Sequence, residues 1–522
     1  MLVHKFVLRI WWTCVHSPSC ANFQMLTKLN SFANIGIECE KITVEIACSR
    51  GDMPSMHIVG LGDKAVQESA QRVKMALRSS GLNMPTGRAI TINLAPADLR
   101  KAGPRYDLPI ALGLMLLHGA VLIADEDLES TAFIGELALD GTLRHVSGVL
   151  PAAIACKDHG IKTLVVPSAN APEARLIPGI KVIFADSLIE LAQIFNGERA
   201  CGEPLCANIN PLPENEIDFA DVRGQEHAKR ALEIAAAGGH NVLLSGAPGA
   251  GKTLLARAFK GILPPLSQEE SIEVMKIYSV ANLLPRDTAL IQERPFRIIH
   301  HTASGVSIVG GGQIPGPGEI SLAHKGVLFL DELGEFPSQV LEVLRQPLED
   351  RTITITRAHG AVTFPADFIM VAAMNPPRFS SGGVQKFKSR ISKPFLDRID
   401  LTIDVLPVPV DDLQKEPNLQ REKSNDIRNR VIRARERQSK RFTGLKIRTN
   451  KEMNVKHIDL FCKLDTQSSQ LLRQAVTHLD LSARSYHRVI KVSRTIADLA
   501  GENDIMTRHI AEALQYRQNI GV

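Results

Sequence analysis

Alternating apolar and polar residues near the start of the chain predict half-buried β-strands. Apolar residues occupy every second position over 41–47 and again over 89–94, which is the period of a strand with one face in a core. Between them, 63–80 has apolar residues at three- and four-residue steps and is followed by Gly81, which predicts a helix and its end. Two further strand candidates are 163–166 and 182–184. Together these elements predict an α+β module over 25–195.

Longer apolar segments dominate the centre of the chain, over about 218–410. The segments at 241–245, 327–330 and 368–374 have the length and composition of strands that are buried on both faces. Because each one leads into glycine or polar residues, they predict a parallel α/β sheet that brings these residues to one edge. The preceding stretch, 196–217, has three prolines and little periodicity, and we interpret it as a linker.

Helical periodicity marks the last segment, 411–522, most clearly at 471–479 and 486–499, and predicts a small helical lid. Between Lys415 and Lys451, thirteen Lys or Arg residues stand against four Asp or Glu residues. One helical face there would carry Arg430, Arg433, Arg437, Lys440 and Arg441. Such a face can follow nucleic-acid phosphates, although a plain solvated face is equally compatible with the pattern.

The most specific motif is a phosphate-binding loop that follows the first central strand. It has the pattern G-x-x-x-x-G-K-[ST] and consists of Gly246, Ala247, Pro248, Gly249, Ala250, Gly251, Lys252 and Thr253. In such a loop the backbone N–H groups turn toward phosphate oxygens, Lys252 brings positive charge to them, and Thr253 offers a hydroxyl to Mg²⁺. The sequence therefore predicts that the chain binds ATP with Mg²⁺, with an ordinary glycine-rich turn as the alternative.

Two adjacent carboxylates, Asp331 and Glu332, follow the second central strand. We expect Asp331 to hold Mg²⁺ through its water shell and Glu332 to polarise the attacking water, because phosphoryl transfer needs a placed nucleophile and neutralised charge. A solvated strand end is the alternative interpretation. The phosphate loop earlier in the chain favours the catalytic one.

Three more polar residues complete the predicted ATPase site. Asn375 ends the third central strand and is expected beside the γ-phosphate. Arg398 is expected at the subunit edge, where an arginine supplied to a neighbouring subunit stabilises transition-state charge; a surface ion pair with Asp397 or Asp400 is the alternative. Arg484 begins a predicted lid helix and is expected to reach back over the nucleotide.

The composition is that of an ordinary globular protein, with 44% apolar and 22% charged residues among 522 and a net charge of +5. This charge permits an anionic partner without requiring one. The 8 cysteines show no C-x-x-C spacing, so neither a zinc site nor a disulfide framework is indicated. Cysteines without such a framework suit a reducing compartment, and we expect a cytoplasmic protein. No apolar run is long enough to span a bilayer. Residues 1–24 precede the patterned sequence and are expected to be an upstream extension of the reading frame.

With these motifs in view, the chain resembles the magnesium-chelatase-like AAA+ ATPases of bacteria, the YifB/ComM family, over nearly all of its length after Met25. The resemblance rests on long runs at 29–32, 57–61, 93–99, 106–111, 222–226, 235–241, 300–304 and 310–320. It implies an N-terminal module with a ribosomal-protein-S5-like fold related to the Lon protease domain, then a central AAA+ ATPase domain and a helical lid. It also implies a hexameric ring in which Asn375 is sensor 1, Arg398 is the finger that acts in trans and Arg484 is sensor 2. The glycine-rich run at 310–320 would form a hairpin that faces the pore.

One stretch departs from the family pattern. Where relatives carry cysteines after the sensor asparagine, 376–383 has none and looks shortened. A zinc-like or redox element is therefore absent from this stretch. The sequence therefore gives no basis for carrying over to this chain any nucleic-acid contact that such an element makes in relatives.

The resemblance implies a ring motor that uses ATP to drive branch migration of DNA during natural transformation, with branched or single-stranded DNA as its partner. A chelatase motor that works with partner subunits to insert a metal into a tetrapyrrole is the alternative, but such motors lack the N-terminal module. A Lon-like protease is a third possibility, and it needs a serine with a lysine base. Ser69 with Lys74, or Ser79 and Ser80 nearby, stand in no supporting motif.

Overall fold

The computed structural model describes residues 25–50, 55–82, 88–202, 217–285, 290–312, 315–357, 360–376, 391–408, 421–479 and 481–517. The predicted N-terminal extension, most of the predicted linker and most of the cysteine-free stretch lie outside these residues. The chain divides into two compact units, Met1–Ile209 with Ser279–Ala289 and Asn210–Tyr278 with Leu290–Val522. Within the described residues, no helix is both long enough and apolar enough to cross a bilayer.

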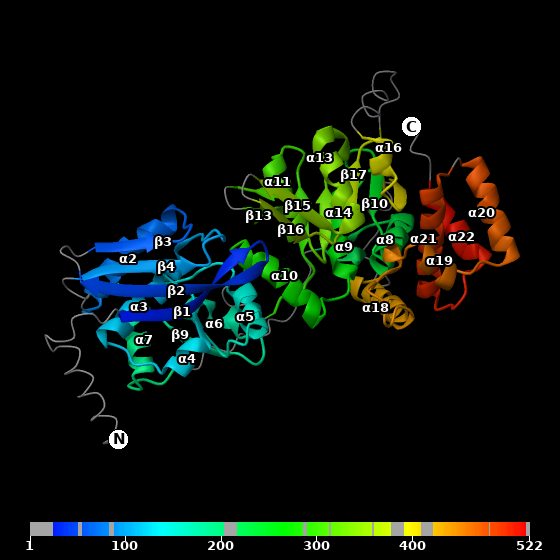
Figure 1. Cartoon of the computed structure of the whole chain (residues 1–522). Helices are drawn as coiled ribbons and strands as arrows, with labels where there is room; N and C mark the ends of the chain where they lie inside the picture. Colours follow the sequence, from blue (N-terminus) through cyan, green and yellow to red (C-terminus); the bar gives the residue numbers. More distant parts are fainter. Residues whose placement is uncertain are drawn as a thin grey trace. The chain divides into compact units, whose positions relative to one another are not determined.

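A seven-stranded mixed sheet forms the N-terminal unit, in the order β3-β4-β2-β1-β5-β8-β9. Figure 1 labels β3, β4, β2, β1 and β9 of this sheet. The strands are β1 (Met25–Ile35), β2 (Glu38–Arg50), β3 (Ser55–Val59), β4 (Arg88–Ala95), β5 (Thr131–Phe133), β8 (Thr163–Pro167) and β9 (Lys181–Ala185). β2 pairs antiparallel with both β1 and β4, and the remaining pairs are parallel. The alternating residues Ile42, Val44 and Ile46 are fully buried, so the predicted strand period is confirmed.

The helices of this unit include the one predicted over 63–80. They are α2 (Lys64–Ser79), α3 (Asp107–His118), α4 (Asp125–Glu129), α5 (Val149–Asp158), α6 (Ala171–Ala174) and α7 (Leu188–Phe195), with the 3-10 turns η1 (Pro104–Tyr106) and η2 (Ser168–Asn170) and the small ladder of β6 (Glu136–Leu137) and β7 (Leu143–Arg144). Asp63 caps α2 by accepting a hydrogen bond from the Val66 N–H at 2.9 Å. Gly81 then takes a left-handed φ of 70°, the conformation that commonly ends a helix.

The second unit contains a five-stranded parallel sheet in the order β11-β14-β17-β10-β18. Figure 1 labels two of its inner strands, β17 and β10. The strands are β10 (Val242–Gly246), β11 (Phe296–Ile299), β14 (Val327–Leu330), β17 (Ile369–Met374) and β18 (Leu401–Val405). β14 and β17 are buried along their whole length, as predicted from their uninterrupted apolar sequence. Leu330 lies opposite Ala372, and Met374 lies opposite Ser245. The segments that follow these three strands therefore emerge at one edge of the sheet.

Short helices and two hairpins surround this sheet. They are η3 (Phe219–Asp221), α8 (Glu226–Gly238), α9 (Lys252–Ile262), α10 (Gln268–Val280), α11 (Gly305–Val309), α12 (Glu319–Leu322), η4 (Leu333–Glu335), α13 (Ser338–Val343), α14 (Arg345–Asp350), α16 (Lys393–Leu396), the hairpin of β12 (Gly310–Gly311) with β13 (Gly316–Pro317) and that of β15 (Thr352–Arg357) with β16 (Gly360–Pro365). At Gly310, a Cβ atom would lie 2.3 Å from the carbonyl oxygen of Gly316. The glycine-rich run therefore forms a ladder closer than a side chain would allow.

The C-terminal helices pack within the same unit as the parallel sheet. They are α18 (Ser424–Arg441), η5 (Asn450–Glu452), α19 (Val455–Phe461), α20 (Thr466–His478), α21 (Ala483–Ala500) and α22 (Thr507–Gln515). α18 contacts α8 and α9, and α21 contacts α8 (Figure 1). Asp498 is buried on α21, where it pairs with Arg441 and, at 3.0 Å, with Arg494. The predicted α/β class with a helical lid is confirmed.

The basic stretch on α18 is divided between internal ion pairs and solvent. Arg430 pairs with Glu233 of α8 at 2.5 Å and also with Glu422, and Arg441 pairs with the buried Asp498 described above. Arg433, Arg437 and Lys440 are exposed. Because the first and last of the five cations are neutralised by neighbouring carboxylates, the exposed part of this face is reduced to three cations, fewer than phosphate tracking along the whole helix would use.

Candidate active site

The phosphate loop connects the end of β10 to the start of α9. Gly249 and Gly251 have φ values of 80° and 92°, in the left-handed region that side chains disfavour. A Cβ atom at Gly246 would lie 2.3 Å from the carbonyl oxygen of Val405 on β18. The first glycine of the motif therefore permits close strand packing, and the other two permit the turn that exposes backbone N–H groups.

Lys252 is the first residue of α9, and its ammonium group makes three contacts at the loop. Nζ donates to the carbonyl oxygens of Gly246 at 2.7 Å and Ala247 at 2.9 Å, and to Oδ1 of Asn375 at 3.0 Å. Burial lowers the pKa of Lys252, while the nearby charges of Asp331 and Glu332 act to raise it. The structure therefore brings the lysine of the loop and the predicted sensor asparagine together.

Thr253 and Asp331 supply the oxygen atoms that suit a magnesium ion. Thr253 Oγ1 lies 3.4 Å from Asp331 Oδ2, and Asp331 Oδ1 accepts a hydrogen bond of 3.0 Å from the backbone N–H of Glu332. A hydroxyl and a carboxylate are hard oxygen ligands of the kind that Mg²⁺ prefers, and Mg²⁺ usually retains several waters beside them. The two side chains fit the ion that was predicted for them.

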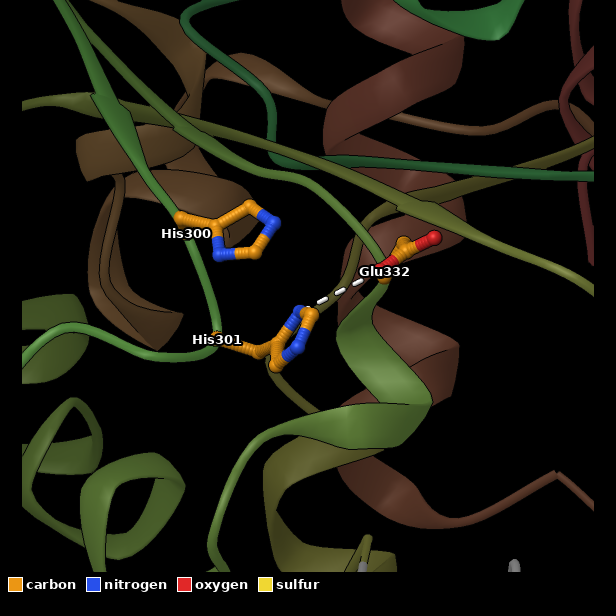
Figure 2. Close-up of side chains that lie close together, drawn as sticks. All are labelled: His300, His301 and Glu332. Atoms are coloured by element: carbon orange, nitrogen blue, oxygen red, sulfur yellow. Dashed lines mark ion pairs between the residues drawn. The ribbon is translucent and has the colours of Figure 1, made fainter.

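A residue that the sequence analysis did not single out contacts the predicted catalytic base. Nδ1 of His301 lies 3.2 Å from Oε2 of Glu332, as Figure 2 shows. His301 follows β11 and Glu332 follows β14, and these strands are neighbours in the sheet. Glu332 itself has a left-handed φ of 55°. The contact was missed because it depends on strand order, although the two histidines that end a short apolar segment were a visible signal.

These groups line one pocket of about 390 Å³ at the carboxyl edge of the sheet. The lining residues are Pro248, Gly249, Ala250, Gly251, Lys252, Thr253, Leu254, Asp331, Glu332, Ala373, Met374 and Asn375. The volume lies within the range typical of small-molecule sites. The loop, both carboxylates and the asparagine are thus brought together, as the sequence predicted.

Arg398 lies near the amino ends of the parallel strands, whereas the phosphate loop lies at their carboxyl ends. It precedes β18, whose first residue, Leu401, is opposite Val242 at the start of β10. The loop begins at the other end of these strands, about 13 Å away at 3.3 Å per residue. Arg398 is 5% exposed, and its Nη2 atom lies 2.5 Å from Oε1 of Glu349 on α14. The ion pair of Arg398 is therefore with Glu349 and not with Asp397 or Asp400, the surface partners of the alternative interpretation.

Arg484 shares the same carboxylate. Nη1 of Arg484, in the first turn of α21, lies 3.3 Å from Oε1 of Glu349. The lysine, the two adjacent carboxylates and the asparagine line the phosphate pocket, and Arg484 does not. The structure therefore groups Arg484 with Arg398 instead of placing it over the phosphate loop of its own chain, where it was predicted.

Comparisons with known proteins give matches to the same kind of protein in both units of the chain. Three family profiles match: "Magnesium chelatase, subunit ChlI" over 218–413, "Subunit ChlI of Mg-chelatase" over 44–170 and "Magnesium chelatase, subunit ChlI C-terminal" over 421–517. The chain is 43% identical over 505 residues to Competence protein ComM of Haemophilus influenzae, covering 93% of this chain and 96% of that protein. It is 42% identical over 503 residues to the uncharacterized protein YifB of Escherichia coli, covering 94% and 97%. A weaker match to Lon protease 2 of Bacillus subtilis, 27% identical over 231 residues, covers 38% and 40%.

The parallel sheet, the phosphate loop and the family profile together define an ATPase of the AAA+ class. AAA+ proteins of this kind use ATP together with Mg²⁺. The extent of the matches makes the assignment more specific. The chain belongs to the magnesium-chelatase-like YifB/ComM family.

Proposed function

We propose that this chain is an ATP-hydrolysing motor that works as a closed ring, with six subunits as the expected number, and acts on DNA. The proposal rests on the distance between the lysine of the phosphate loop and the two arginines. Lys252 lies at the phosphate pocket, whereas Arg398 and Arg484 meet at Glu349, and Arg398 precedes the amino ends of the strands. A single subunit therefore holds only part of the charge that a phosphoryl-transfer site uses, and a neighbouring subunit is the natural source of the rest.

Each residue at the pocket has a distinct role in this proposal. The N–H groups of the loop and Lys252 hold the phosphates, and Mg²⁺ held by Thr253 and Asp331 neutralises their charge when bound. Glu332 polarises the attacking water. Asn375, which already accepts a hydrogen bond from Lys252 at 3.0 Å, orients the γ-phosphate end of the site.

The arginines complete the site from the adjacent subunit. Arg398 exchanges its contact with Glu349 for the transferring phosphoryl group, an arrangement that in trans is worth about 10³ or more in rate. Arg484 lies on the same carboxylate, so we assign it to the same face of the subunit. Hydrolysis then depends on assembly.

DNA is the proposed partner because a relative of nearly equal length is named Competence protein ComM. We propose that the motor drives branch migration during natural transformation, with the β12–β13 hairpin directed toward the pore. The three exposed cations of α18, Arg433, Arg437 and Lys440, are too few to provide a DNA-binding face on their own. The DNA contact is therefore expected mainly from the ring interior.

The direct test measures ATP hydrolysis by the purified chain alone and with single-stranded, duplex and branched DNA, together with strand displacement on a forked substrate. We expect branched or single-stranded DNA to stimulate hydrolysis, and strands to be displaced only when ATP is hydrolysed. The Lys252→Ala variant is the matched control, since it lacks the phosphate contact. Hydrolysis that is indifferent to every DNA, with no strand displaced, would remove the DNA motor from consideration.

A chelatase motor is the second candidate, because all three matching family profiles describe magnesium-chelatase subunits. Isolation of a stable, ATP-dependent complex with a metal-insertion subunit would place it first. Proteolysis has less support despite the match to Lon protease 2. Ser69 is buried and bonds to Ala65 and Arg72, and Lys74 is exposed. Cleavage of an unfolded protein with ATP present would be needed to revive it.

A further inference from the structure

Two consecutive histidines lie directly beside the predicted catalytic base. β11 ends at Ile299 and β14 ends at Leu330, and these two residues are opposite each other in a parallel pair. The segments that follow the two strands, with His300 and His301 after β11 and Glu332 after β14, therefore leave the sheet side by side. Neighbouring strands are about 4.8 Å apart, which is close enough for their side chains to share one small ligand.

The side chains do converge, as Figure 2 shows. A nitrogen of each imidazole and a carboxylate oxygen of Glu332 all lie within 4.8 Å of one another. The two rings are 4.1 Å apart between centroids and are inclined at 36°. His300 is held by a 2.9 Å contact between its Nδ1 and Oγ1 of Thr302. The three groups are thus arranged around one point from two separate strands.

One atom in this cluster lacks the partner that its surroundings call for. Nδ1 of His301 is shielded from solvent and makes no hydrogen bond within the described residues. The carboxylate of Glu332 is only 3.2 Å away, but its direction does not suit a hydrogen bond. A buried ring nitrogen without a partner is costly. A cation that bonds to both the nitrogen and the oxygen satisfies them together.

We propose that His300, His301 and Glu332 form a binding site for a zinc-class divalent cation. Two imidazole nitrogens and one carboxylate oxygen are a known donor set for tetrahedral zinc with an open fourth position. Ligand atoms around such an ion are about 3.3 Å apart, so modest side-chain rotation closes the present separation. His300 and Glu332 are exposed, which leaves a path for the ion and room for a water on it.

The donor set distinguishes this site from the magnesium position at Thr253 and Asp331. Mg²⁺ prefers oxygen ligands and is poorly served by imidazole, whereas zinc, cobalt and nickel accept nitrogen readily. The two ions therefore occupy different places. Among the described residues, no other group of three or more histidine, cysteine or acidic side chains converges in this way.

Occupancy of this site has a direct consequence for hydrolysis, and this part rests on the proposed role of Glu332. A carboxylate oxygen that donates its electron pair to the cation is no longer available to polarise the attacking water. The phosphate loop, Thr253 and Asp331 keep their own contacts, so nucleotide still binds. Zinc at micromolar concentration is therefore a reversible inhibitor that arrests the ATP-bound state.

Binding is tested first, without nucleotide, by titrating the full chain with Co²⁺ and recording the visible absorption of low-coordinate cobalt. The wild-type chain is expected to develop this absorption and to lose it when Zn²⁺ is added in equal amount. His300→Ala and His301→Ala should each reduce cobalt affinity at least tenfold, and Glu332→Gln, which keeps the side-chain size, should do the same. His118→Ala and His478→Ala, at the exposed ends of α3 and α20, are matched controls that should bind as the wild type does.

Two results would overturn the site: no cobalt absorption in the wild type, or absorption that survives in all three ligand variants. Binding of a fluorescent ATP analogue verifies that each variant is folded. The consequence is tested separately, by measuring hydrolysis with excess Mg²⁺ and added Zn²⁺. We expect at least tenfold inhibition of the wild type, and none for His300→Ala relative to its own zinc-free rate. Cobalt binding without inhibition would leave the site standing and refute the assignment of Glu332 as the base.

Discussion

Replacement of Glu332 by glutamine separates nucleotide binding from nucleotide hydrolysis. The amide has the size of the carboxylate but cannot act as a base. The structure shows what the change leaves intact, because the three contacts of the Lys252 ammonium are to Gly246, Ala247 and Asn375. Thr253 and Asp331, the residues proposed to hold Mg²⁺, lie 3.4 Å apart and are not altered by the substitution. The phosphate-binding groups therefore persist while the water loses its activating group.

The expected size of the effect follows from the role assigned to the carboxylate. A positioned general base contributes about 10²–10⁴ in rate, or about 3–5 kcal/mol in activation free energy. Nucleotide affinity should change less than about threefold, since that corresponds to under about 0.7 kcal/mol. Glutamine keeps the size of glutamate, and the backbone N–H of residue 332 still donates to Asp331 Oδ1, so the turn after β14 should keep its structure.

Single-turnover hydrolysis and equilibrium binding of a fluorescent ATP analogue measure the two quantities separately. Glu335→Gln, an exposed change in the same turn but outside the pocket lining, is the matched control and should hydrolyse ATP at the parental rate. A Glu332→Gln variant that hydrolyses within threefold of the parent would refute the assignment of Glu332 as the base. Loss of nucleotide binding in this variant would instead point to a structural role.

Three further changes test other parts of the site and the fold. Lys252→Ala should weaken nucleotide binding at least 100-fold, or about 3 kcal/mol for a lost charged contact, and equilibrium binding checks this. Glu349→Gln should lower turnover about fivefold with binding unchanged, because it removes the carboxylate charge that positions the buried Arg398 and the exposed Arg484, an effect of about 1 kcal/mol; unchanged turnover would argue against positioning. Burial lowers the pKa of Lys491 to about 8, below its unfolded value of about 10.4. The unfolded chain then binds more protons between these values, so stability should rise with pH across this window, and Lys491→Met should flatten the rise in urea unfolding.

The parts of the site that are local in sequence could be predicted from sequence. The phosphate loop is one uninterrupted motif whose chemistry depends on adjacent residues, and Asp331 and Glu332 directly follow a recognisable buried strand. The strand period around Ile42 and the lid helix α21 were likewise accessible, because alternation and helical spacing reflect which side chains are buried.

The contacts that depend on tertiary structure could not be predicted. Arg398 and Arg484 both pair with Glu349, and these three residues come from segments that are far apart in sequence. A periodic pattern of apolar residues does not indicate contacts of this kind. The contact of His301 with Glu332 depends on the pairing of β11 with β14. β11 is itself hard to recognise in the sequence, because it is a four-residue strand that contains an arginine. Pairwise geometry of this kind arises from the order of strands in the sheet.

The central claim is that hydrolysis needs Lys252 from one subunit and Arg398 from its neighbour. It is tested most directly by mixing two inactive variants, Lys252→Ala and Arg398→Ala, and measuring ATP hydrolysis. In a randomly mixed ring about a quarter of the interfaces regain both residues, so activity should reappear at up to about that fraction of the wild-type rate. Arg398→Ala that hydrolyses ATP at full speed alone, or a mixture that stays inactive although the variants assemble together, would contradict the account.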